Sequence, residues 1–103
     1  MTFCSLDDGP DAFDRAKAVV LPIPFERTTS FVSGTRNGPR EIIAASSQVE
    51  LYDEELGASP YETGIATLPE LDVADEGPAA MVERVAAAAR WIASLERFFV
   101  MLG

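Results

Sequence analysis

Histidine is absent from the 103 residues of this chain, and cysteine occurs once, as Cys4. Without histidine the chain lacks the commonest general base and the commonest metal ligand of proteins. A single cysteine excludes an intrachain disulfide and a cysteine-based metal site. Ser46 and Ser47 have no histidine to activate them, so nucleophilic catalysis by either serine is not expected.

Basic residues are also scarce, since eight Lys and Arg stand against 17 Asp and Glu and give a formal net charge of −9. Nucleic acids and anionic membrane surfaces both require clustered basic side chains, so neither is expected as a partner. No apolar run approaches the ~20 residues that span a bilayer. The acidic start resembles no signal peptide, and we expect a cytoplasmic protein. The acidity either serves solubility or suits a small cationic substrate.

Apolar residues make up 48% of the chain and charged residues 24%, which is typical of a soluble globular domain with a modest core. Residues 1–16 are polar and predict either an irregular N-terminal arm or a short helix at 11–16. The continuous apolar run Ala18-Val19-Val20-Leu21 predicts a strand buried on both faces. Pro22 and Pro24 are expected to end it, because proline cannot donate to a sheet.

A long polar loop follows, and Gly38-Pro39 then predicts the start of a helix over about 39–48. Asn37 or Gly38 can cap this helix. Four residues recur at helical spacing and support this helix: Ile42, Ile43, Ser46 and Val49. The acidic segment 49–62 is broken by glycine and proline, which indicates an excursion on the surface.

The second half of the chain predicts a short strand at 65–68, a long helix over 78–96 and a second buried strand at Phe98–Leu102. The long helix opens at Gly77-Pro78, and its apolar stripe is Met81, Val85, Ala88, Ile92 and Leu95. Helices that alternate with strands of this kind imply an α/β fold with a parallel sheet.

Two kinds of motif invite a functional interpretation. SGTRNGPREI places two glycines, an arginine and a proline in a tight loop before a helix, at the edge of a sheet where α/β folds bind ligands. On spacing alone this loop is better explained as a helix-entry turn. The acidic residues favour solvated surface over a metal site, and Tyr52 and Trp91 favour packing: the acids are Glu50, Asp53, Glu54, Glu55, Asp72 and Asp75.

The stretch VVLPIPFERTTSFVSGTRNGPREIIAASSQVELYDEELG resembles the N-terminal part of agmatinases, in the ureohydrolase family that includes arginase. The family pattern is a strand, a Gly-x-Arg-x-Gly-Pro loop, a helix that ends near Ala-Ser, and a tyrosine followed by acids. The matching residues are Gly34, Arg36, Gly38, Pro39, Ala45, Ser46 and Tyr52. The resemblance implies a three-layer α/β/α arginase-like fold with a mainly parallel sheet, of which residues 17–103 form the incomplete N-terminal part after the arm 1–16.

The resemblance also implies an activity for the complete enzyme. Two Mn²⁺ ions would serve the hydrolysis of a small cationic guanidino substrate, agmatine giving putrescine and urea for polyamine biosynthesis, in a homo-oligomer. In the family, the strand that corresponds to Phe98–Gly103 runs into a Gly-Asp/Glu-His-Ser motif with the first metal ligand. That motif is absent, so we expect an inactive fragment with no catalytic or metal residue and no bound metal. The expected contribution is a rim of the active site: Ser30, Gly34, Arg36, Asn37, Gly38 and Pro39.

Two alternatives stay open from the sequence. One is a ureohydrolase for another substrate, such as guanidinobutyrate or a formimino acid. The other is a non-catalytic binding or assembly module on the same scaffold, whose exposed sheet edges and helix face would be covered by a partner.

Overall fold

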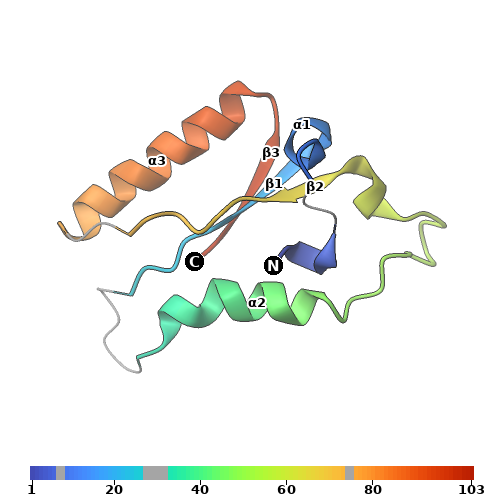
Figure 1. The fold of residues 1–103 in the computed structure, drawn as a ribbon, viewed down its shortest axis with the longest axis horizontal. Helices are drawn as coiled ribbons and strands as arrows, with labels where there is room; N and C mark the ends of the chain where they lie inside the picture. The colour runs from blue at the N-terminus through green and yellow to red at the C-terminus, as the bar shows by residue number, and fades with distance from the viewer. Residues whose placement is uncertain (7–8, 27–32, 74–75) are drawn as a thin grey trace.

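A computed structural model describes residues 1–6, 9–26, 33–73 and 76–103 (Figure 1). Its strands are β1 (Ala18–Pro22), β2 (Ile65–Thr67) and β3 (Phe98–Leu102). They form one sheet in the order β2-β1-β3, and β1 runs parallel to both neighbours. The helices α2 (Gly38–Ser46) and α3 (Pro78–Ser94) lie on opposite sides of this sheet (Figure 1). The expected α/β/α layering with a parallel sheet is therefore confirmed.

Strand β1 lies at the centre of the sheet and is buried as predicted. Val19, Val20 and Leu21 are each at most 4% exposed. A strand with neighbours on both edges and helices on both faces has no solvated side, which explains its unbroken apolar run. The strand includes Pro22, one residue more than predicted, because a proline at the end of a strand costs few ladder bonds.

Helix α3 covers one face of the sheet through the predicted apolar stripe. Ile92 is fully buried and packs with Val19 and Leu21 in the main apolar cluster. Met81 is buried near the start of the helix. The helix begins after Gly77, which has a φ of 109° that few other residues adopt. The predicted helix is confirmed over Pro78–Ser94, and Leu95 lies just beyond it, 39% exposed.

Helix α2 covers the other face, and the helix predicted over about 39–48 is confirmed over Gly38–Ser46. The buried residues are Pro39, Ile43 and Ser46, which recur at i, i+4 and i+7. Of the other residues at helical spacing, Ile42 and Val49 are 44% and 57% exposed. Ile42 points away because its neighbour Ile43 takes the inward position, and Val49 lies beyond the end of the helix.

The N-terminal residues pack between α2 and β2. A short 3₁₀ helix, η1 (Phe3–Ser5), hydrogen-bonds to both, because Phe3 N donates to Thr67 Oγ1 at 2.9 Å and Cys4 N donates to Ser46 Oγ at 2.7 Å. Ser46 Oγ also donates to the carbonyl oxygen of Ile43. The buried hydroxyl of Ser46 therefore joins this segment to α2.

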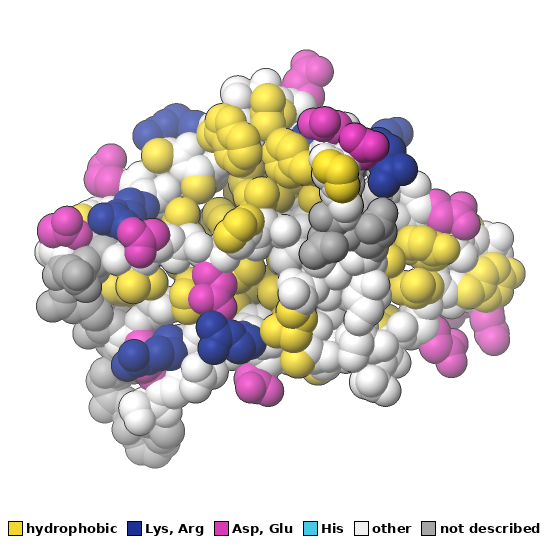
Figure 2. All heavy atoms as spheres, in the orientation of Figure 1, with side chains coloured by type: hydrophobic (Ala, Val, Ile, Leu, Met, Phe, Trp, Pro, Cys, Tyr) yellow, Lys and Arg dark blue, Asp and Glu magenta, His cyan; other side chains and the backbone are white. Residues whose placement is uncertain are grey.

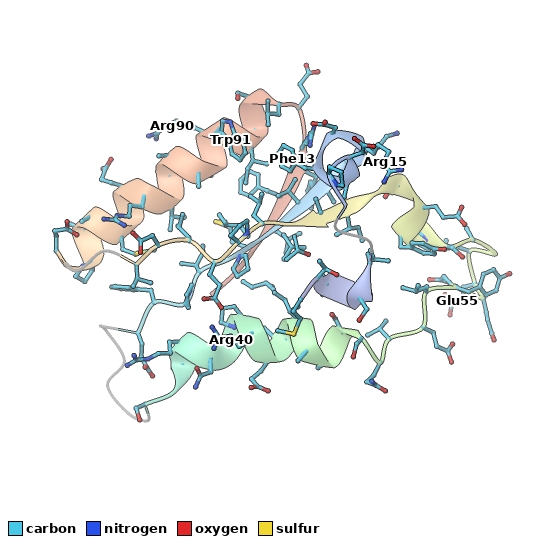
Figure 3. All side chains as sticks on the ribbon, viewed as in Figure 1. Phe13, Arg15, Arg40, Glu55, Arg90 and Trp91 are labelled. Atoms are coloured by element: carbon cyan, nitrogen blue, oxygen red, sulfur yellow. The ribbon has the colours of Figure 1, made fainter. Side chains whose placement is uncertain are left out.

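Helix α1 (Ala12–Arg15) lies beside the C-terminal half of α3. It is shorter than the helix expected at 11–16. The rings of Phe13 and Trp91 stack with centroids 5.6 Å apart and planes 4° apart. Figure 2 shows hydrophobic side chains gathered between α1 and the C-terminal half of α3, and Figure 3 shows these two rings facing one another. The expected packing role of Trp91 is met through this stack, although half of its surface is exposed.

Strand β3 is more exposed than predicted. Phe98, Val100 and Met101 are 71%, 41% and 45% exposed, whereas the sequence predicted a buried strand. The reason is that, within the described residues, β3 pairs with β1 on one edge and with no other strand.

Among the described helices, none is long and apolar enough to cross a membrane.

Candidate functional site at the carboxyl edge of the sheet

The carboxyl ends of the parallel strands meet at one edge, and the described loops extend the sheet there. Ile23 N donates to Leu102 O at 2.8 Å, so β1 and β3 stay joined beyond the last strand pair. Leu71 N donates to Pro22 O at 2.8 Å on the other side of β1. Because ligands of open α/β sheets bind outside the carboxyl ends of the strands, this edge is the candidate site.

A carboxylate organises the loop that follows β1. Glu26 Oε1 accepts hydrogen bonds from the backbone N–H groups of Gly34 and Thr35, the latter at 2.6 Å. Glu26 Oε2 accepts from Arg36 Nε at 2.6 Å. The side chain of Glu26 is 8% exposed, whereas that of Arg36 is 68% exposed. The carboxylate is thus enclosed by the loop, and the guanidinium forms the outer surface.

The same contacts change the acidity of Glu26. The hydrogen bond from Arg36 contributes most to a pKa below the ordinary value of 4.5. The N–H groups of Gly34 and Thr35 and the charge of Arg36 act in the same direction, and desolvation opposes them. The three hydrogen bonds therefore favour the charged form of Glu26.

We refer to the described residues 33–39 as the rim loop. Gly34 has a φ of 114°, which lets the chain turn toward Glu26. A short 3₁₀ helix, η2 (Thr35–Asn37), then leads directly into α2. A Cβ built on Gly38 would lie 3.5 Å from the carbonyl oxygen of Gly103. The start of α2 is therefore next to the end of β3, and Figure 1 shows the C-terminus over the first turns of α2.

The structure thus brings most of the predicted rim residues together. Gly34 and Arg36 contact Glu26, Gly38 lies beside Gly103, and Pro39 is buried in the first turn of α2. The expected capping differs, because the described structure shows no capping hydrogen bond from the side chain of Asn37. Ser30 lies outside the described residues.

Sequence reasoning missed Glu26. The signal was present, since this acid lies four residues after Pro22 at the end of the strand and eight residues before the Gly-x-Arg-x-Gly-Pro loop. A carboxylate between a strand end and an arginine-bearing loop is a reasonable ion-pair partner. Its contact with backbone N–H groups, however, depends on the loop conformation and could not be inferred from spacing.

An apolar groove of about 610 Å³ lies on the other side of the same edge. It runs between the first half of α3 and the ends of β1 and β3, and its lining includes Phe25, Met81, Val82 and Met101. Gly103 also lines it, so this residue lies between the groove and the rim loop. An apolar lining can hold hydrocarbon groups but supplies no charge to bind or polarise a substrate.

The described residues do not fit a metal centre. Within the described part of the chain, no three His, Cys, Asp or Glu side chains gather so that they could hold a metal ion. Asp53 instead stabilises the surface segment 49–62. It pairs with Ala58 in an isolated bridge and accepts a hydrogen bond from Leu56 N. Figure 3 shows Glu55 on this excursion, remote from the carboxyl edge. No catalytic step through a metal is therefore derived for these residues.

Comparison with known proteins gives matches along nearly the whole chain. Residues 16–103 match the family model described as the Arginase family. An N(1)-aminopropylagmatine ureohydrolase of Synechocystis sp. is 48% identical over 65 residues, which is 62% of this chain and 21% of that protein. A guanidinobutyrase of Pseudomonas aeruginosa is 38% identical over 72 residues, which is 70% of this chain and 20% of that protein.

A solved structure is similar over still more of the chain. The agmatine ureohydrolase of Thermoplasma volcanium superposes with a TM-score of 0.79 and 27% sequence identity, and the match covers 94% of this chain and 34% of that one. The chain therefore spans about a fifth of the length of the curated relatives and about a third of the solved structure.

Proposed function

This chain belongs to the Arginase family, and on that premise we propose that it is the N-terminal portion of a longer ureohydrolase. The complete protein hydrolyses the guanidino group of an agmatine-type amine, and agmatine gives putrescine and urea. The supporting observation is the difference in coverage, because the match takes in 94% of this chain and 34% of the agmatine ureohydrolase structure.

The chemistry explains why this portion does not act alone. A guanidinium has a pKa above ~12 and is a poor electrophile, so its hydrolysis needs a strong, fixed nucleophile. Two Mn²⁺ ions are the proposed cofactor of the complete protein, and such a pair supplies a strong nucleophile at neutral pH. The described residues do not fit that centre. We place its ligands outside the described residues.

Residues 17–103 contribute the first part of the sheet and one wall of the active site, with residues 1–16 as an arm. The rim of that site consists of Ser30 and the matching loop residues Gly34, Arg36, Asn37, Gly38 and Pro39. This assignment is supported by the position of the described rim residues at the carboxyl edge, beside Gly103. The complete protein is proposed to be a cytoplasmic homo-oligomer of polyamine biosynthesis that binds neither nucleic acid nor membrane.

The choice among guanidino substrates rests on charge. Relatives are named for N(1)-aminopropylagmatine and for guanidinobutyrate, which differ in carrying an amine or a carboxylate. This chain has a formal net charge of −9, which favours the approach of a polycationic amine over that of a carboxylate. Agmatine and its aminopropyl derivative are therefore preferred to guanidinobutyrate or a formimino acid.

A substrate panel tests this proposal. The complete protein is freed of metal, reloaded with Mn²⁺ and assayed for urea release from agmatine, N(1)-aminopropylagmatine and guanidinobutyrate. We expect one of the two amines to have the highest kcat/KM. Absence of urea from every substrate would refute the activity, whereas preference for guanidinobutyrate would refute only the charge argument.

A non-catalytic binding or assembly module is the second candidate, and the exposure of β3 favours it. Phe98 is 71% exposed on a strand whose outer edge has no partner among the described residues. A second copy or another protein could cover that edge. A chain 1–103 that is monomeric and molten in solution would count against this candidate.

A further inference from the structure

We propose that Glu26 is a positioning residue, which holds the rim loop at the carboxyl edge of the sheet so that Arg36 lies at the entrance of the active site. This inference rests on the proposed ureohydrolase function. It assigns a role to a residue outside the motif that identified the loop.

The segment that leads to Glu26 is joined to the sheet at Ile23. Ile23 N donates to Leu102 O at 2.8 Å, and Phe25 N donates to Ile23 O at 2.9 Å. The segment between β1 and Glu26 therefore starts at the edge formed by β1 and β3, and its second bond is a local turn. The side chain of Glu26 fixes the conformation of the rim loop best if it forms several hydrogen bonds to that loop.

Glu26 forms such bonds to three consecutive residues. One oxygen accepts the N–H groups of Gly34 and Thr35, and the other accepts Arg36 Nε. Successive N–H groups that converge on one anion form a nest, here opened by the left-handed conformation of Gly34. Hydrogen bonds to a charged acceptor are about twice as strong as neutral ones. The conformation of the loop and the direction of Arg36 thus depend on one carboxylate.

The position of the rim loop explains why its hydrogen bonds to Glu26 matter for substrate binding. The next residue after the loop's 3₁₀ helix is Gly38, which lies beside Gly103 at the end of β3. A displaced loop would move this wall of the entrance. Glu26 itself is enclosed and paired with Arg36, so it acts on substrate through the loop that it holds.

The test uses the complete protein with Glu26→Gln, which keeps the shape of the side chain but removes its charge. We expect KM for the guanidino substrate to rise about tenfold while kcat stays within about twofold, because the loop shapes the entrance and not the chemistry. Thermal unfolding should be nearly unchanged. Glu26→Asp should recover part of the loss, since it restores the charge on a shorter side chain.

Asp72→Asn is the matched control. Asp72 is also paired with an arginine, Arg84, at 3.2 Å, but its side chain is 92% exposed and its partner lies on α3. We expect this variant to leave KM and kcat unchanged. Arg36→Ala retains the N–H bonds to Glu26 and should raise KM less than Glu26→Gln, and it serves as the second variant if Glu26→Gln fails to fold.

Hydrogen–deuterium exchange separates this inference from the proposed function. The amide protons of Gly34 and Thr35 should exchange about tenfold faster or more in Glu26→Gln than in the wild type, whether or not urea is released. A wild type without activity refutes the proposed function, and it leaves exchange to decide whether Glu26 holds the loop. Unchanged exchange overturns the inference in either case. Faster exchange with unchanged KM overturns the positioning role.

Discussion

Gly64 lies directly against Ala16, where the start of β2 meets the start of β1. A Cβ on Gly64 would be 2.9 Å from the Cα of Ala16 and equally close to the carbonyl oxygen of Arg15. Lys17 N and Ala18 N both donate to the Gly64 carbonyl, at 3.0 and 3.2 Å. The close approach of the two backbones thus starts the pairing of β1 with β2.

Gly64→Ala should therefore be among the most destabilising substitutions in this chain. Gly64 has a φ of 92°, and its added methyl would meet backbone atoms that cannot move independently. Gly77→Ala is the control, because Gly77 has a φ of 109° but no neighbour within 4 Å of an added Cβ. Urea unfolding of the complete protein should give a loss of about 2–4 kcal/mol for Gly64→Ala and at least ~1 kcal/mol less for Gly77→Ala. Equal losses would show that the clash is relieved by small shifts.

Phe13 is expected to stabilise the chain through two ring contacts. Its ring stacks on Trp91, and the guanidinium carbon of Arg97 lies 4.3 Å from its centroid. Phe13→Leu keeps an apolar side chain but removes both contacts, so we expect a loss of about 1–2 kcal/mol. Trp91 is the only tryptophan, and its fluorescence should report the change directly. A variant with unchanged stability and spectrum would refute the role of the stack.

The stability of the rim loop should depend on pH through Glu26. The pKa of this carboxyl is lower in the folded chain than its ordinary value of 4.5. Above pH 4.5 the group is charged in both states and its stabilising effect is complete. Below that value the unfolded chain takes up a proton first, so the effect declines and is lost once the pH falls below the folded pKa. Exchange of the Gly34 and Thr35 amides against pH should show this decline in the wild type, whereas a similar profile in Glu26→Gln would contradict it.

The chain 1–103 in isolation should be weakly stable and should associate. Phe98 and Val100 expose apolar surface on an edge strand, and a chain of this size has little stability to spare. We expect a broad thermal transition with a midpoint that depends on concentration. Phe98→Lys should reduce association measured by sedimentation, because a charge on an edge strand disfavours pairing. A sharp, concentration-independent transition of a monomer would contradict this expectation.

The sequence predicted the elements of the fold well where local pattern decides them. The unbroken apolar run of β1, the proline at the start of α2 and α3, and the stripe through Ile92 each depend on residues close in the chain. Exposure was predicted less well, because it depends on what lies opposite. The apolar sequence of β3 is typical of a buried strand, yet Phe98 is 71% exposed. No described strand pairs with the outer edge of β3.

The candidate site was likewise predictable only where local sequence decides its structure. The rim loop was found from its motif, since glycine and proline constrain the backbone locally. Glu26 was not found, because its partners are eight to ten residues away and reach it only through a left-handed turn at Gly34. The contact between Gly38 and Gly103 joins residues 65 positions apart and could not be predicted from periodicity.

Urea release from agmatine-type amines, measured side by side for the complete protein and for the chain 1–103, tests the central claim most directly. Both are freed of metal and assayed with and without added Mn²⁺. The account predicts Mn²⁺-dependent release by the complete protein and none by the chain 1–103, in which the described residues do not fit a metal centre. Release by the chain alone, or no release by the complete protein, would contradict it.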